Sequence, residues 1–146
     1  MLRFTLLPAA LILASLSQPA AAQMLPAVTV YKSPTCGCCA KWVEHVRKAG
    51  FAVTVKDVPN VGEVKLANGV PADLASCHTA LVAGYVVEGH VPADVIQKLL
   101  KEKPAVAGIA VAGMPMGSPG MEGSYSDRYD IVAFEKSGKQ RVYASR

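Results

Sequence analysis

Three cysteines lie within four consecutive positions, and their spacing is the clearest sign of chemistry in this sequence. The cluster reads Cys36-Gly37-Cys38-Cys39. Residues three apart lie one above the other on a helix, so the sulfurs of Cys36 and Cys39 can meet. At a helix N-terminus the unpaired N–H groups and the helix dipole stabilise a thiolate, so we expect Cys36 to be the more reactive thiol. This pair alone indicates a dithiol redox site.

Cys38 distinguishes this cluster from an ordinary dithiol. A third thiol beside a redox pair would invite wrong disulfides, whereas three thiolates at one helix end can bind a soft metal. Thiolate and thioether ligands select Cu(I) over harder cations. The alternative is that Cys38 is a bystander beside a dithiol pair. Covalent haem attachment is excluded because Ala40, and not histidine, follows Cys39.

A segment rich in methionine, glycine and proline offers further soft ligands. Met114, Met116 and Met121 lie between Gly113 and Gly123, where no amphipathic period predicts a helix. Methionine more often fills a core, but this loop provides none. Thioethers suit Cu(I) in an oxidising compartment where thiolates are easily lost. We expect Met116 and Met121 to be the ligating pair, rather than any pair that includes Met114.

The elements that position these residues alternate between strand and helix periods. The predicted order is β-α-β-α-β-β-α, followed by the Met-rich loop and a C-terminal β-hairpin. This order predicts an α/β, thioredoxin-like fold in which the first two strands are parallel. The segments, in order, are strand 27–31, a helix from the cysteines to Gly50, strand 51–56, a short helix after Asn60, strands 78–83 and 85–91, a helix after Pro92, a short extended piece at 109–112, and a hairpin of 130–135 with 140–144.

Cys77 and His78 open the third predicted strand. In a thioredoxin-like fold the start of that strand lies beside the first turn of the cysteine-bearing helix, so we expect both side chains to face the cluster. The alternative for Cys77 is a small buried apolar residue, which is a common role for free cysteine. His45 lies on the margin of the apolar face of the cysteine-bearing helix, and we expect it to be a solvated residue.

The N-terminus has the pattern of a secretory signal peptide. Arg3 precedes an apolar run at 4–16, and Ala20-Ala21-Ala22 forms a small-residue cleavage site. The predicted organisation is a signal peptide at 1–22 and one copper-binding domain at 23–146. The alternative, an uncleaved membrane anchor, is disfavoured because the run is short for a span of about 30 Å. We therefore expect a periplasmic protein with no membrane span after cleavage.

Charge and cysteine usage exclude other classes of protein. Lys and Arg number 15 against 11 Asp and Glu, which is a weak bias, and no basic cluster indicates a nucleic-acid partner. A domain of this length can bury a core without staples. Structural disulfides are usually spread along a chain, whereas three of these four cysteines crowd together. The cysteines are therefore redox or metal groups.

Longer motifs carry a resemblance to a known family. The motifs are the cysteine cluster, Ser-Cys-His-Thr-Ala at 76–80, Glu-Gly-His-Val-Pro at 88–92 and Gly-Met-Pro-Met-Gly-Ser-Pro-Gly-Met-Glu at 113–122. Together they resemble the CopG-type copper-resistance family, formerly a domain of unknown function, over about residues 28–146. The resemblance implies a periplasmic copper-binding protein with copper oxidoreductase activity. It also favours His90 as a ligand, a position where strand-end histidines are more often exposed.

The predicted function is therefore copper binding with cycling between Cu(I) and Cu(II), contributing to copper resistance. Cys36 and Cys39 are the predicted catalytic pair, and the copper site is expected to bind at least two Cu(I) ions per chain. Its partners are copper ions and other periplasmic copper-handling proteins. A thiol-disulfide oxidoreductase and a non-catalytic copper chaperone remain alternatives, and zinc storage is a weaker one because it would leave the thioethers idle. The predicted metal ligands are Cys36, Cys38, Cys39, Cys77, His78, His90, Met116 and Met121.

Overall fold

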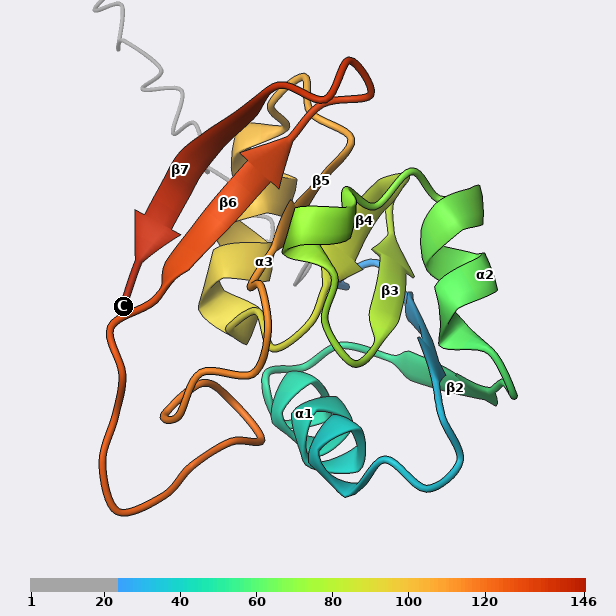
Figure 1. Ribbon diagram of the computed structural model, residues 1–146, viewed down its shortest axis with the longest axis vertical. Coiled ribbons are helices and arrows are strands. Elements are labelled where there is room, and N and C mark those ends of the chain that lie inside the picture. The colour runs from blue at the N-terminus through green and yellow to red at the C-terminus, as the bar shows by residue number, and fades with distance from the viewer. Residues whose placement is uncertain (1–23) are drawn as a thin grey trace, which may run out of the picture.

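The computed structural model describes residues 24–146, and its elements follow the predicted order (Figure 1). The predicted signal peptide at 1–22 lies outside the described residues. The elements are β1 (Val28–Lys32), α1 (Gly37–Lys48), β2 (Val53–Asp57), α2 (Val61–Ala67), the short 3-10 helix η1 (Ala72–Leu74), β3 (Thr79–Val82), β4 (Tyr85–Glu88), α3 (Ala93–Glu102), β5 (Gly108–Ala110), β6 (Asp130–Phe134) and β7 (Gln140–Ser145).

The strands form one sheet of seven in the order β2-β1-β3-β4-β5-β6-β7. β1 and β2 are parallel and are joined by α1, while β3 is antiparallel to both β1 and β4. The predicted α/β class is confirmed, and these first four strands have the arrangement expected of a thioredoxin-like fold. The β3–β4 turn uses Ala83 and Gly84, which both have positive φ, as a tight antiparallel turn requires.

The C-terminal hairpin forms as predicted, but it is a continuation of the sheet. β5 pairs in parallel with β4, and β6 then pairs antiparallel with β5, so that β6 and β7 extend the same sheet. The link is the short β5, whose three residues are all buried. The hairpin therefore stands on the sheet that carries the site.

Alternate side chains of the strands point to opposite faces of the sheet, and each face has its own cover. On one face, Val30, Ala80 and Val87 pack with α1 and α3 in the main core. On the other face, Val86 and Phe134 pack with Leu74 of η1, and α2 lies on this side. Helices therefore cover both faces of the sheet.

Strand direction brings four separated segments to one edge of the sheet. β1, β4 and β5 run the same way, and β3 runs against them. The carboxyl ends of β1, β4 and β5 therefore meet the beginning of β3. The segments at this edge are the cysteine cluster after β1, Cys77-His78 before β3, His90 after β4 and the Met-rich loop after β5. In Figure 1 that loop, drawn in orange, runs toward α1.

Candidate metal centre

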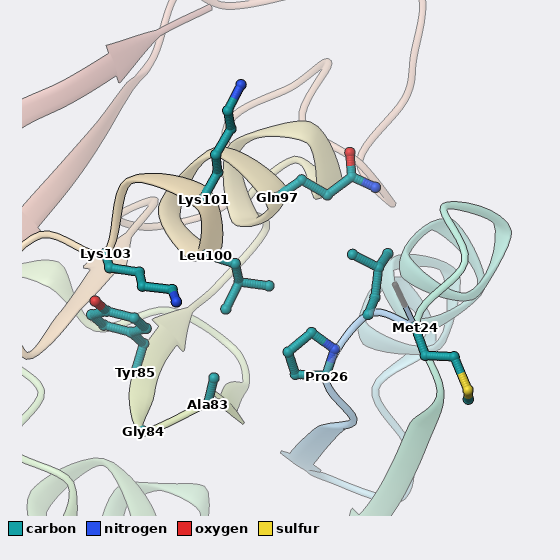
Figure 2. Close-up of a pocket in the computed structure, with 10 residues that line it drawn as sticks. Met24, Pro26, Ala83, Gly84, Tyr85, Gln97, Leu100, Lys101 and Lys103 are labelled. Atoms are coloured by element: carbon teal, nitrogen blue, oxygen red, sulfur yellow. The ribbon is translucent and has the colours of Figure 1, made fainter. Parts of the chain in front are cut away.

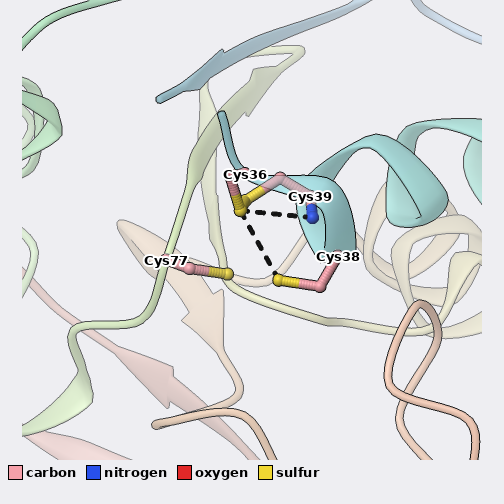
Figure 3. A group of neighbouring side chains, drawn as sticks. All are labelled: Cys36, Cys38, Cys39 and Cys77. Atoms are coloured by element: carbon pink, nitrogen blue, oxygen red, sulfur yellow. Dashed lines mark hydrogen bonds between the residues drawn. A yellow bond between two sulfur atoms is a disulfide. The ribbon is translucent and has the colours of Figure 1, made fainter. Parts of the chain in front are cut away.

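The cysteine cluster forms the first turn of α1. Cys36 is the N-cap residue, and its Sγ accepts a hydrogen bond from the backbone N–H of Cys39 at 3.3 Å. Cys36 and Cys39 are joined by a disulfide, as their helical spacing allows. Cys38 carries a free thiol whose Sγ lies 3.5 Å from the Sγ of Cys36 (Figure 3). The third thiol therefore lies beside the Cys36–Cys39 disulfide without belonging to it.

Cys77 faces this turn from the segment just before β3, as Figure 3 shows. The sulfurs of Cys36, Cys38, Cys39 and Cys77 all lie within 4.8 Å of one another. Burial, reinforced by the nearby Cys38 thiol, raises the pKa of Cys77 to about 11. Cys77 is therefore a protonated thiol at neutral pH, and a bound cation would be needed to make it a thiolate.

His90 connects Cys77 to the Met-rich loop. Its Nε2 lies 2.9 Å from the Sγ of Cys77, and its Nδ1 lies 2.8 Å from the carbonyl oxygen of Pro119. A carbonyl only accepts hydrogen bonds, so the proton must be on Nδ1. Nε2 therefore presents its lone pair toward the Cys77 sulfur, which is the orientation that a metal-binding histidine needs.

His78 is fully buried and lacks a partner on one ring nitrogen. Its Nδ1 lies 3.4 Å from the Sγ of Cys77, while Nε2 has no hydrogen-bond partner among the described residues. The ring packs on Trp42 with a centroid distance of 4.4 Å. Burial lowers the pKa of His78 well below its usual range, helped by His90, and burial also lowers the pKa of His90. Both imidazoles are therefore neutral at pH 7.

Two of the three loop methionines border the cysteine turn. Met116 and Met121 line an open hollow of about 360 Å³ together with Cys38, Lys41 and Glu122. Met114, by contrast, is half exposed and is absent from the lining of this hollow. The structure thus places the two methionines preferred from sequence beside the third thiol.

The eight predicted ligands gather at one edge of the sheet. Cys77, His78 and His90 form one close group, and the four sulfurs form another that shares Cys77. Because Cys36 and Cys39 share a disulfide here, they can act as thiolate ligands only after reduction. Cys38 and Cys77 offer thiols directly.

His45 was expected to be a solvated residue, and this expectation is wrong. Its side chain is half-buried, and Nε2 accepts a hydrogen bond of 3.0 Å from the backbone N–H of Ala93. Ala93 is the first residue of α3, whose N-cap residue Pro92 offers no side-chain acceptor. His45 therefore links α1 to the N-terminus of α3. Burial lowers its pKa, which keeps the ring neutral and able to accept.

Sequence reasoning also missed a buried ion pair next to the site. Glu88 is fully buried, and its Oε1 lies 2.5 Å from Nζ of Lys65 on α2. A carboxylate at the end of an apolar strand is the signal that could have identified it. It lies on the opposite face of the sheet from His78, because Thr79 and Glu88 are paired across β3 and β4.

A larger hollow than the one beside Cys38 lies away from these groups. Its volume is about 850 Å³, and it is lined by residues that include Tyr85, Leu100 and Lys103 (Figure 2). The turn at Ala83-Gly84 borders it, which is the end of β3 opposite Cys77. Among the described residues that line it there is no cysteine or histidine. Within residues 24–146 the structure also contains no helix with the length and apolarity needed to span a membrane.

Comparisons with known proteins agree with the motifs. Two solved structures, named copper resistance protein CopG form 1 and form 2, share 43% sequence identity with this chain. Each comparison covers 84% of this chain and 98% of the other, with TM-scores of 0.79 and 0.80. A family model described as a protein of unknown function, DUF411, matches residues 74–121. A search of curated protein sequences gave no match.

The two kinds of match cover different parts of the site. The family model spans Cys77, His78, His90 and the Met-rich loop, but it does not reach the cysteine cluster. The match to the solved structures includes nearly their full length. It supports the resemblance predicted from all four motifs. The chain belongs to the family of the copper resistance protein CopG.

Proposed function

We propose that this protein binds copper at the sheet edge and contributes to copper resistance. The observation that carries the proposal is the position of Cys38 and Cys77, two free thiols that meet beside the buried His78 and His90. A dithiol oxidoreductase needs only the Cys36–Cys39 pair. Two further thiols and two buried imidazoles at the same point are a ligand set.

The chemistry of the donor atoms fits copper. Thiolate, thioether and imidazole are the ligands that favour copper over hard cations. The Nδ1 atom of buried His78 lies 3.4 Å from the Cys77 sulfur and can serve as a nitrogen ligand at this point. The neutral imidazoles have lone pairs available, and the proton of Cys77 would leave on metal binding.

The Cys36–Cys39 pair adds electron transfer to this proposal. When these two thiols close into a disulfide they release two electrons and two protons, and two Cu(II) ions each accept one electron to become Cu(I). Further turnover takes two electrons from an external dithiol, which restores Cys36 and Cys39 by exchange. In this proposal the Cys36–Cys39 disulfide is the product of the electron transfer. Cys36 and Cys39 are thus the proposed catalytic residues.

Two other functions use part of the same site. A thiol-disulfide oxidoreductase would use Cys36 and Cys39, but it leaves Cys38, Cys77 and the methionines without a role. A copper chaperone would use all the ligands without electron transfer, delivering the ion to other copper-handling proteins. Copper stoichiometry distinguishes the proposed function from a thiol-disulfide oxidoreductase. Redox turnover distinguishes it from a copper chaperone.

The proposed location is the periplasm, reached through a signal peptide at 1–22. Support comes from the sequence pattern and from the soft donor set, which suits an oxidising, metal-exposed compartment. Intact-mass measurement of exported protein should give a chain that begins near Gln23. Retention of Met1 in that material would contradict the proposal.

The central experiment is a copper titration of the purified mature chain. After reduction and removal of excess reductant, we expect more than one Cu(I) ion per chain, held in preference to Zn(II), because thiolate sulfur can bridge metals. The oxidation state is then followed after addition of Cu(II) to the reduced protein. A capacity of one ion, or displacement of copper by equimolar zinc, would contradict the proposed site.

A further inference from the structure

A buried carboxylate holds both flanks of the Cys77-His78 segment. The Oε1 atom of Glu88 accepts a hydrogen bond of 2.7 Å from the backbone N–H of Ser76. Its Oε2 accepts one of 2.7 Å from the hydroxyl of Thr79. Ser76 and Thr79 are the residues immediately before and after Cys77-His78. Glu88 itself is fully buried on the opposite face of the sheet.

Lys65 completes this arrangement from α2. Its Nζ contacts Oε1 of Glu88 at 2.5 Å and the Thr79 hydroxyl at 3.1 Å. Each oxygen of the carboxylate therefore has a partner. Burying two charges is costly, and apolar residues of similar size often stabilise a fold at least as well. Stability alone therefore does not explain the buried pair of Lys65 and Glu88.

The same contacts reach the Met-rich loop. The hydroxyl of Ser76 donates to the carbonyl oxygen of Gly113 at 2.5 Å, one residue before Met114. The backbone of the segment is also tied to β4, because Gly89 N–H donates to the His78 carbonyl at 3.0 Å. Glu88 thus fixes Ser76, and Ser76 fixes both Cys77 and the start of the loop.

We infer that Glu88, with Lys65, is a positioning residue that sets the place of the Cys77 sulfur and the His78 ring for copper. This inference rests on the proposed copper site. The carboxylate does not touch the metal ligands' donor atoms. It acts through the N–H of Ser76, so the required property is a buried acceptor at that point rather than a negative charge.

The test compares two neutral double variants. Lys65→Met with Glu88→Gln removes both charges but keeps an amide oxygen that can accept from Ser76 N–H. Lys65→Met with Glu88→Leu removes the charges and the acceptor together. Both are expected to fold, because replacing a buried ion pair with neutral residues is often tolerated. Lys98→Met with Glu102→Gln is the matched control, an exposed pair on α3 away from the site.

Two measurements are made on each variant. The first is the Cu(I) dissociation constant, measured with Cu(I) alone against a chromogenic chelator. The Leu variant should bind about tenfold more weakly, while the Gln variant and the control stay close to wild type. Circular dichroism reports the folding of each variant. If Glu88 and Lys65 had only a structural role, folding would be lost in parallel with copper affinity.

The second measurement needs no metal. In a Cys38→Ser background with the Cys36–Cys39 disulfide intact, Cys77 is the remaining thiol, and its alkylation rate reports its position. This rate should rise severalfold in the Leu variant, because a displaced Cys77 thiol is more accessible, and change little in the Gln variant. Unchanged Cys77 alkylation and unchanged copper affinity in a folded Leu variant would overturn the inference. Failure of the wild type to bind copper would instead refute the proposed function and leave the alkylation test in force.

Discussion

The Nε2 atom of His90 lies 2.9 Å from the Sγ atom of Cys77, and the other ring nitrogen is held by the carbonyl of Pro119. The end of β4, the segment before β3 and the Met-rich loop are therefore joined through one imidazole ring. Copper binding at Cys77 should depend on the loop, even at loop residues that carry no ligand. Gly120, next to Pro119, provides a direct way to examine this dependence.

Gly120→Ala should weaken copper binding while leaving the protein folded. An added Cβ would lie 2.6 Å from the carbonyl oxygen of Cys38 and 3.0 Å from the backbone nitrogen of Trp42. The loop must therefore move away from α1. We expect Cu(I) affinity to fall about tenfold, as happens when the support of a metal ligand is disturbed.

The matched control for this change is Gly138→Ala. Gly138 has a φ of +87°, close to the +89° of Gly120, but an added Cβ there meets nothing within 4 Å. Both variants therefore place an alanine at a similar positive φ. Equal copper affinity in the two proteins would show that the close contact between the loop and α1 is not needed.

Replacing both loop methionines beside Cys38 should lower copper affinity selectively. Met116→Leu with Met121→Leu keeps the apolar volume and removes both thioethers, so we expect Cu(I) affinity to fall about tenfold with little change in the unfolding midpoint. Met114→Leu is the control, since Met114 is 50% exposed and lies outside the hollow. Competition with a chelator measures the Cu(I) affinity of the wild type, the double variant and the Met114→Leu control. A loss in the control as large as in the double variant would contradict the assignment.

The contribution of His45 to stability should disappear in acid. Burial lowers its pKa in the folded chain, so below the unfolded pKa of about 6.5 the unfolded state binds the proton first. The hydrogen bond to Ala93 N–H therefore stabilises the fold at pH 8 and is lost as the pH falls through and below 6.5. His45→Ala should cost about 1 kcal/mol at pH 8.

The difference between wild type and His45→Ala should shrink when the same denaturant titration is repeated at pH 5. His78 and His90 also have lowered pKa values, but they are present in both proteins and cancel in the comparison. A difference that stays constant from pH 8 to pH 5 would show that His45 does not act through its neutral ring.

The parts of the fold that were predictable depend on local pattern. The helical period after Cys36, the short helix after Asn60 and the strand connection at Gly84 each depend on neighbouring residues, and each was found where expected. The turn at Gly84 also includes Ala83, which had been assigned to the strand. The pairing of β5 with β4 and β6 was not predicted, because a three-residue buried strand carries little signal and its partners lie far away in sequence.

The same distinction holds for the site. Cys38, Cys77 and the methionines could be named because their residue types are rare and chemically specific. The roles of His45 and Glu88 depend on partners 48 and 23 residues away, Ala93 and Lys65, which no local pattern reveals. The Pro119 carbonyl that orients His90 is a backbone atom, so its role could be seen only in three dimensions.

Cys38→Ser separates copper chemistry from disulfide exchange most directly. In a dithiol oxidoreductase, Cys36 and Cys39 carry the reaction and Cys38 is idle. In a copper site Cys38 is a ligand at the edge of the hollow, and its partly exposed side chain is not among the residues of the hydrophobic core. Cys36→Ser would damage both activities, so it cannot distinguish them.

The deciding measurement is the copper content of purified Cys38→Ser after loading with Cu(I), with circular dichroism as the check on folding. We predict a folded protein that holds markedly less copper than wild type and no longer protects cells against copper. Full copper loading together with wild-type protection would contradict the copper site and favour the dithiol function.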